Sequence, residues 1–154
     1  MIKKTKQGYI TFCNTNRNFK ENEVLNGSFL IYESIEDSLR FTTLDDDKVI
    51  AKVTALDDFQ LVDSDYYDYY NMVITNKLLI NKIYSYNEII DEMLNNKNEL
   101  QIERFLKHFK LKEEDIEKFK KIHPYVDRAA WFYQEGDLDA YNVGKHLIKK
   151  NKHQ

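Results

Sequence analysis

The apolar residues of this chain change their spacing at Ser85, and this change constrains the fold more than any other feature of the sequence. Between Lys48 and Leu56 small and branched apolar residues occupy alternate positions, which is the period of a half-buried β-strand. After Ser85 the apolar residues recur every three or four positions, as they do along one face of an α-helix. The sequence therefore predicts a strand-rich region, residues 1–84, followed by a helical region, residues 85–154.

Five or six short strands and one short helix are expected in the first region. The predicted strands are residues 8–12, 28–32, 48–56, 59–62, 72–75 and 78–84. Asn26-Gly27 and Asn76-Lys77 are expected to form turns, the second of them in a hairpin. Ser34 is expected to cap the helix, which carries Ile35 and Leu39. Because long crossovers between parallel strands are missing, the sheet is predicted to be small and mostly antiparallel.

The second region is predicted to contain about five helices. Their expected starting residues are Ser85, Asn98, Glu113, Pro124 and Asp137. Ser85 and Glu88 have the spacing of a capping box. The strongest periodic stripe consists of Ile102, Phe105, Leu106 and Phe109. Since no linker rich in Pro, Gly or Ser separates the regions, we expect an α+β fold in which the helices pack with the sheet as one body.

Composition and charge exclude several classes of protein. Cys13 is the single cysteine, no apolar run is long enough for a membrane helix, and the first residues lack the apolar stretch of a signal peptide, so a cytoplasmic location is expected. The net charge of −3 and the pI of about 5.8 argue against direct nucleic-acid binding. The last lysines are expected to complement a helix dipole, with contact to phosphates as the alternative; they are Lys145, Lys149, Lys150 and Lys152.

The sequence contains no established catalytic or metal-binding motif, and we assign no catalytic residue, metal ligand or cofactor. One alternative is a hydrolase-like or transferase-like enzyme in which Cys13 is activated by a histidine. Its candidate partners are His108, His123, His146 and His153. The other enzymatic alternative uses carboxylates with a metal, because hard cations bind clusters of oxygen atoms. Its candidate acidic stretches are residues 45–47, 57–58 and 63–65.

The segment from Asp63 to Tyr70 combines tyrosines with aspartates and is the most unusual stretch of the chain. Tyrosine provides a large contact area at low cost in conformational entropy and is favoured where proteins bind proteins. Carboxylates among the rings would also complement a basic surface. The alternative is a segment whose tyrosines pack inward. The predicted partner-binding residues are Asp63, Asp65, Tyr66, Tyr67, Asp68, Tyr69 and Tyr70.

Residues 23–93 resemble an uncharacterised domain found in phage and prophage proteins. The resemblance is carried by five stretches, which are residues 27–32, 36–41, 50–56, 74–80 and 86–93. Phe29 and Ile31 stand where the family has a histidine and a cysteine. What the resemblance implies is an origin in a mobile element.

These observations favour a small non-enzymatic protein-binding factor of a phage or other mobile element. We expect it to inhibit a host protein by covering its surface, with a nucleic-acid-handling defence complex as the favoured target. Besides the enzymatic alternatives, the helices from Asn98 onward permit a structural protein that assembles with itself.

Overall fold

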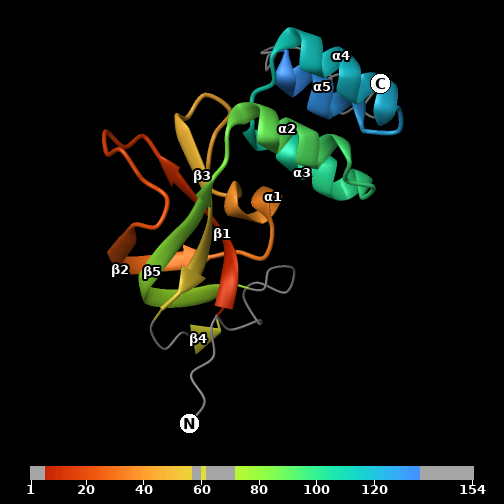
Figure 1. Ribbon diagram of the computed structural model, residues 1–154. Coiled ribbons are helices and arrows are strands. Elements are labelled where there is room, and N and C mark those ends of the chain that lie inside the picture. Colours follow the sequence, from red (N-terminus) through yellow and green to blue (C-terminus); the bar gives the residue numbers. More distant parts are fainter. Residues whose placement is uncertain (1–5, 57–59, 62–71, 136–154) are drawn as a thin grey trace, which may run out of the picture. The chain divides into compact units, whose positions relative to one another are not determined.

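The computed structural model describes residues 6–56, 60–61 and 72–135, and for Gln60 and Leu61 it describes the backbone alone. The strands are β1 (Lys6–Cys13), β2 (Val24–Ile31), β3 (Lys48–Ala55), β4 (Gln60–Leu61) and β5 (Val73–Ile83). The helices are α1 (Ile35–Ser38), α2 (Tyr86–Leu94), α3 (Glu99–His108), α4 (Glu113–Ile122) and α5 (Arg128–Gln134) (Figure 1). The predicted α+β class is confirmed, with the sheet and one short helix preceding the other helices.

The chain divides into two compact units. The first takes its described residues from Met1–Thr42 and Asp46–Ile89, and the second takes them from Thr43–Asp45 and Ile90–Gln154. The expectation that both regions form one continuous body stays a prediction. None of the helices in the described ranges has both the length and the apolar composition needed to cross a membrane.

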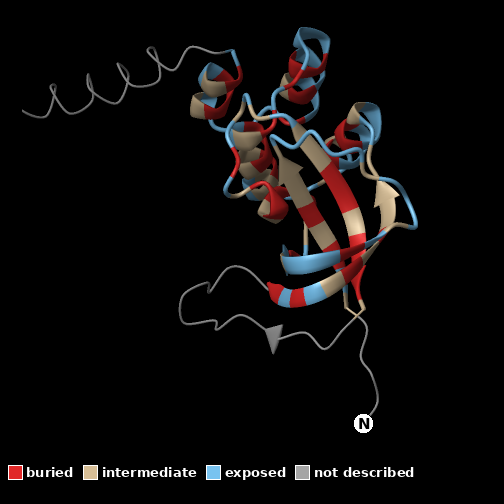
Figure 2. Ribbon diagram, turned by 90° about the vertical axis from the view of Figure 1, so that its left-hand side faces the viewer, coloured by how far each residue is buried: buried red, intermediate tan, exposed pale blue. Residues whose placement is uncertain are grey.

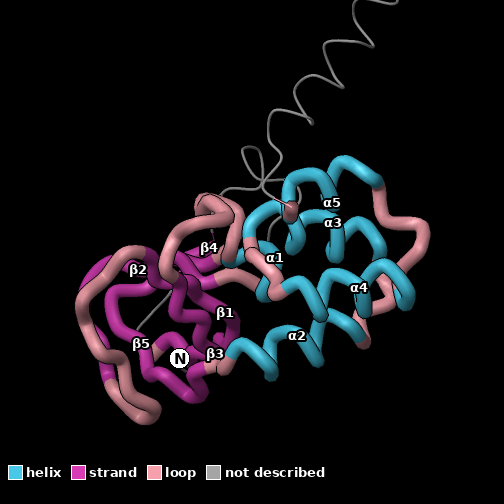
Figure 3. The backbone as a smooth tube through the Cα atoms, turned by 90° about the horizontal axis from the view of Figure 1, so that it is seen from above, coloured by secondary structure: helices cyan, strands magenta, loops and turns pink. Residues whose placement is uncertain are grey.

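The five strands form one antiparallel sheet in the order β1-β3-β5-β2, and β4 pairs with β5. The 11-residue strand β5 pairs with β2 between Val73 and Leu79 and with β3 between Leu78 and Ile83. The outer strands β1 and β2 then meet at an isolated bridge between Tyr9 and Tyr32. The sheet is therefore curled until its two edges touch, and Figure 3 shows the strands curving around a common centre. We call the line along which β1 and β2 face each other the seam.

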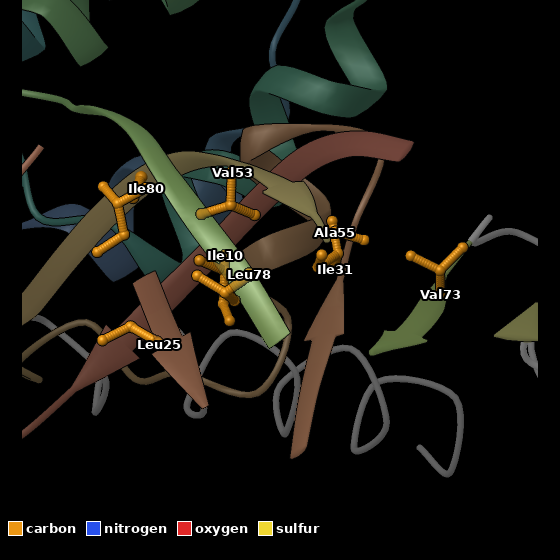
Figure 4. Packing of buried hydrophobic residues seen from close by; sticks show 9 residues of the cluster. Ile10, Leu25, Ile31, Val53, Ala55, Val73, Leu78 and Ile80 are labelled. Carbon is orange, nitrogen blue, oxygen red and sulfur yellow. The ribbon is translucent and has the colours of Figure 1, made fainter. Parts of the chain in front are cut away.

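The inward side chains of the curled sheet form its hydrophobic core. Ala51, Val53 and Ala55 belong to this core, as expected for the apolar face of β3. The prediction that β3 is half-buried is wrong, because Ile50 and Thr54 on its other face are buried as well, at 1% and 8% exposed. Buried positions alternate with less buried ones along much of β1 and β5, and Figure 2 shows such alternating bands on the strands, because successive side chains of a strand point to opposite faces. Figure 4 shows the cluster, which consists of Ile10, Leu25, Ile31, Ala51, Val53, Ala55, Val73, Leu78 and Ile80.

The predicted helix starts are confirmed where a side chain caps the helix. Ser34 Oγ accepts a hydrogen bond of 3.2 Å from the N–H of Asp37 in α1. Asn98 Oδ1 accepts bonds of 3.1 and 3.2 Å from the N–H groups of the second and third residues of α3. These side chains satisfy donors that have no partner within the first turn of a helix. The predicted stripe of α3 is buried, and the ring of Phe105 lies 5.0 Å from that of Phe109 and 6.2 Å from that of Phe119.

The predicted capping box of α2 is also confirmed. The N–H of Ser85 donates to Glu88 Oε1 at 3.1 Å, and the N–H of Glu88 donates to Ser85 Oγ at 3.2 Å. The ammonium of Lys82 lies 2.6 Å from Glu88 Oε2. The hydrogen bond from Lys82, followed by those from Ser85, lowers the pKa of Glu88 from its usual 4.5 to about 2.

We expect the carboxyl carbon of Glu88 to titrate in NMR spectra with a midpoint near pH 2. The pKa of Glu88 is lower in the folded than in the unfolded chain, so its ionised carboxylate stabilises the fold. This stabilisation is fully present above about pH 4.5 and is lost as the pH falls toward 2. Lys82→Met is expected to raise the midpoint more than Ser85→Ala, since Lys82 contributes most to the shift. A midpoint near 4.5 in the unaltered chain would contradict the capping geometry.

Both predicted Asn-containing turns are wrong. Asn26 and Gly27 lie within β2, where the pairing with β5 is irregular between Asn26 and Phe29. Gly27 has a φ of +154°, so it absorbs the irregularity in a conformation that other residues rarely adopt. The predicted hairpin at Asn76-Lys77 is part of the continuous strand β5. Lys77 pairs with Asn26 of β2, and its carbonyl accepts a hydrogen bond of 2.9 Å from the N–H of Leu56. Bonding on both sides therefore holds this stretch extended.

The helix that was predicted to begin at Pro124 is α5, and it does not begin there. It begins after Asp127, whose carboxylate accepts a hydrogen bond of 2.9 Å from the N–H of Ala129. Asp127 caps the helix with its carboxylate, whereas proline has no side-chain acceptor. Pro124 lies in the turn that precedes the helix. The fifth predicted helix, from Asp137 onward, lies outside the described residues, as do the outer residues of the strand predicted at 59–62.

Candidate binding groove at the sheet seam

The seam is closed at one residue pair. The N–H of Tyr9 donates to the carbonyl of Tyr32 at 2.7 Å, and the N–H of Tyr32 donates to the carbonyl of Tyr9 at 2.9 Å. Gly8 makes this approach possible, because a Cβ atom there would lie 2.4 Å from the Tyr32 oxygen and 2.5 Å from Cγ2 of Ile31. Both distances are too short for any side chain, so the close contact of the strands depends on glycine.

Beyond this pair the backbone edges of β1 and β2 point at each other without bonding. The N–H and C=O groups of successive residues in a strand point alternately to its two neighbours. Because Tyr9 directs its groups toward β2, Thr11 and Cys13 also direct theirs toward the seam and away from β3. Tyr32 fixes the same orientation for Leu30 on β2. Among the described residue pairs across the seam, only Tyr9–Tyr32 is hydrogen-bonded.

A groove of about 280 Å³ occupies the space where the strands diverge. Two of its apolar lining residues are notably accessible, since Phe41 is 68% exposed and Leu30 is 38% exposed. An exposed aromatic ring beside unpaired strand edges is typical of a surface that contacts another chain. We call this space the seam groove; it is lined by residues 10–13 of β1, residues 28–30 of β2, Tyr32, Ser38, Phe41 and Thr42.

Three hydroxyl groups of the seam groove, those of Thr11, Ser38 and Thr42, are engaged within the protein. Ser38 Oγ donates to the carbonyl of Ile35 at 2.6 Å, so it accepts the hydrogen of Thr11 Oγ1, which lies 2.8 Å away. Thr42 Oγ1 donates to the carbonyl of Leu39 at 2.7 Å. These bonds tie α1 to β1 and hold one wall of the groove in place. Their hydrogens point to protein acceptors, which favours a structural role for these hydroxyls.

Cys13 lies half-buried at the end of the groove. Burial raises the pKa of its thiol, the carboxylate of Asp46 raises it further, and the ammonium of Lys48 opposes them. Asp46 is held near the end of β1 by Asn14, whose Nδ2 donates to its carboxylate at 3.1 Å. Because the thiolate is the nucleophile, a thiol with a raised pKa is poorly reactive at neutral pH. The surroundings of Cys13 therefore favour an unreactive sulfur.

We expect alkylation of Cys13 by iodoacetamide to be slow at neutral pH and to reach half its maximal rate above the usual thiol pKa of 9.0. Asp46→Asn removes a negative charge and is expected to lower this midpoint, although burial keeps it above the usual value. Lys48→Met serves as the opposite control and is expected to raise it. A midpoint below 9 in the unaltered chain would show an activated thiol and contradict this description.

The histidines within the described residues belong to the second unit, whereas Cys13 belongs to the first. The Nε2 atom of His123 lies 3.0 Å from the carbonyl oxygen of Leu94, and its ring lies 6.0 Å from that of Phe119. Since a carbonyl only accepts, Nε2 carries the hydrogen, and His123 joins the ends of α4 and α2 as a buried structural residue. His108 lies in the last turn of α3, and His146 and His153 lie outside the described residues. The pairing of Cys13 with a histidine stays a prediction.

The acidic loop at residues 45–47 is used for structural contacts. Asp46 and Asp47 bond to Asn14, and the carboxylate of Asp45 lies 3.8 Å from the ammonium of Lys110. In the ranges that the structure describes, no group of three or more His, Cys, Asp or Glu residues is placed to hold a metal ion. The acidic residues at 57–58 and 63–65 lie outside those ranges.

A second groove, of about 460 Å³, lies on the helical unit and is lined in part by Lys120, Trp131 and Glu135. The ammonium of Lys120 lies 3.0 Å from Glu135 Oε1 and 5.8 Å from the centre of the Trp131 ring. The charges of Lys120 and Glu135 therefore compensate each other, and the Trp131 side chain is 9% exposed. This groove has no unpaired strand edge, so the seam groove is the better candidate for a binding site.

Sequence patterns did not indicate the seam groove. The predicted partner-binding segment, Asp63 to Tyr70, lies outside the described residues. The available signals for the groove were Gly8 within an apolar strand and the aromatic Phe41 just after a short helix, and neither identifies which strands meet.

No protein-family model, curated protein or solved structure matches this chain.

Proposed function

We propose that this chain is a small protein-binding factor that acts by covering a surface of its partner. The observation that supports the proposal is the seam groove, in which unpaired strand edges lie beside the exposed side chains of Phe41 and Leu30. Unpaired edges offer directional hydrogen bonds to another polypeptide, and apolar side chains beside them gain free energy when a partner buries them.

The size and chemistry of the groove agree with this function. Sites for drug-sized ligands and cofactors usually occupy about 300–1,000 Å³, and the seam groove of about 280 Å³ lies just below that range. The hydroxyls of Thr11, Ser38 and Thr42 are bonded to protein acceptors, and the pKa of the Cys13 thiol is raised by burial. These features favour contact with a peptide chain over chemistry on a small substrate.

The proposal extends to the origin and the target suggested by the sequence. In it, the chain serves a phage or another mobile element and blocks a host protein that handles nucleic acid. The net charge of −3 and the acidic tyrosine-rich segment from Asp63 to Tyr70 support a target with a basic surface. Such a surface normally binds phosphates, so an acidic protein lying on it would exclude the nucleic acid.

Phe41→Ser is expected to abolish partner capture if the seam groove binds the partner. The immobilised chain is incubated with an extract of the cells that carry its gene, and bound proteins are quantified by mass spectrometry. Tyr125→Ser is the matched control, since Tyr125 is also a highly exposed aromatic residue, at 81%, and does not line the groove. We expect a protein enriched on the unaltered chain and on Tyr125→Ser to be reduced at least tenfold on Phe41→Ser. Equal capture by all three proteins would contradict a role for the groove.

The acidic segment requires a separate variant. Combined replacement of Tyr66, Tyr67, Tyr69 and Tyr70 by Ala should weaken capture of the same protein, and added NaCl should weaken it further because salt screens the charges. Unchanged capture would remove this segment from the interface. If light scattering instead shows a mass that increases with concentration and no partner is captured, the chain assembles with itself and the proposed function is wrong.

A further inference from the structure

The edge of β1 at the seam has the features of an open position in the sheet. Thr11 and Cys13 each direct one N–H and one C=O group into the seam groove, on the side opposite to their neighbour β3. Two residues of an extended strand span about 6.6–6.8 Å. These four groups therefore have the spacing with which an added strand forms hydrogen bonds.

We propose that the seam groove binds an extended segment of a partner protein, which pairs with β1 at Thr11 and Cys13 as an additional strand. This inference rests on the proposed function and specifies its mode of binding. Main-chain hydrogen bonds to an exposed sheet edge provide affinity without demanding a particular sequence, and pockets beside the edge select the side chains.

Two of the devices that keep other edges unpaired, charged residues and proline, are missing at the seam edge. Natural proteins protect edge strands with charged residues, proline or a covering element. The residues whose backbone groups face the groove, Thr11, Cys13 and Leu30, are uncharged, and none is proline. The bridge between Tyr9 and Tyr32 closes one end of the groove. Beyond this bridge the edges of β1 and β2 are open and line the groove.

The walls of the groove indicate which segment fits. Phe41 stands on the side of α1 and Leu30 on the side of β2, and both are accessible beside the open edge. Side chains of an added strand alternate between its faces, so every second residue of the segment would contact this apolar surface. The favoured partner is therefore a short extended segment with apolar, preferably β-branched or aromatic, residues at alternate positions.

The test uses a displayed library of random ten-residue peptides that is selected on the full chain, followed by amide hydrogen exchange of the chain with an enriched peptide. We expect alternating apolar residues in the enriched peptides, and protection of the Thr11 and Cys13 amides on binding. Cys13→Pro removes one donor that faces the groove and is expected to weaken binding about tenfold, the effect of about 1.4 kcal/mol. Gln7→Pro is the matched control, because the N–H of Gln7 has the same orientation on β1 but lies outside the groove. The affinity of this variant for the peptide should stay within about twofold of that of the unaltered chain.

Each result separates this inference from the wider function. If Phe41→Ser abolishes peptide binding while the Thr11 and Cys13 amides stay unprotected, the groove binds protein but strand addition is wrong. If no peptide is enriched, strand addition is also wrong, and protein binding is then judged by the capture experiment. Protection of the same amides in the chain alone, increasing with its concentration, would identify a second copy of the chain as the occupant and overturn the inference.

Discussion

Replacing Gln134 with Met is expected to lower the free energy of unfolding of the helical unit by about 3 kcal/mol or more. The Gln134 side chain is 2% exposed and bonds three backbone groups. Its Nε2 donates to the carbonyls of Leu106 and Phe109 at 2.5 Å each, and its Oε1 accepts from the N–H of Leu111 at 2.9 Å. Met has a similar length and no comparable donor or acceptor, so all three backbone groups would be buried without a partner, at about 1–3 kcal/mol each.

These three bonds matter because Leu106 lies in the last turn of α3, where carbonyl groups have no partner within the helix. Urea unfolding followed by far-ultraviolet circular dichroism measures the loss. Gln101→Met is the matched control, since Gln101 is half-buried and accepts one bond of 3.0 Å from the side chain of Asn96. It should cost less than about 1 kcal/mol, because water can replace that bond. Equal stability of both variants would show that Gln134 does not anchor the end of α3.

Gly8→Ala is expected to destabilise the sheet unit by about 2–3 kcal/mol, in the range of overpacked cores. The added Cβ would overlap the carbonyl oxygen of Tyr32 and Cγ2 of Ile31. Neither atom moves freely, because the Tyr32 carbonyl accepts the bond from Tyr9 and Ile31 is buried in the core. Relief of the overlap requires separation of β1 and β2, so the seam should open.

Urea unfolding measures the stability, and amide exchange of Tyr9 and Tyr32 reports on the bridge. Both amides should exchange faster in Gly8→Ala, relative to the other amides of β1. Gln7→Ala, an exposed neighbour on the same strand, should change the stability by no more than about 0.5 kcal/mol. If Gly8→Ala is as stable as the unaltered chain and keeps slow exchange at Tyr9, the closed seam is wrong.

The sequence was most informative where a structural signal lies within a few residues. Ser34, Asn98 and the Ser85–Glu88 pair predict helix starts because each side chain reaches the backbone of its own first turn. The Asn-Gly and Asn-Lys pairs failed because pairing between β2 and β5 overrode their local preference for turns. Pro124 failed because the N-cap that decides the start of α5 is Asp127, three positions later. In these cases tertiary contacts or a better local cap outweighed the preference of a residue type.

The candidate site depends on contacts that local patterns do not contain. The seam joins Tyr9 to Tyr32, and its groove adds Phe41 from the segment after α1. Periodicity identifies β1 and β2 as strands, but it does not state that they meet at one pair and then diverge. The bonds of Gln134 likewise connect α5 to the end of α3. A buried polar residue in a helix suggests such an anchor only after its burial is known.

The strand order also affects how the chain reaches its folded state. Lys6 pairs with Ala55, and Val24 pairs with Leu79, so ladders connect segments that are distant in the sequence. During synthesis on a ribosome, β2 cannot form its hydrogen bonds until its partner strand β5 has been made. Closing such long loops costs entropy before the contacts repay it, whereas helices form from near neighbours. We therefore expect the sheet unit to form more slowly than the helical unit.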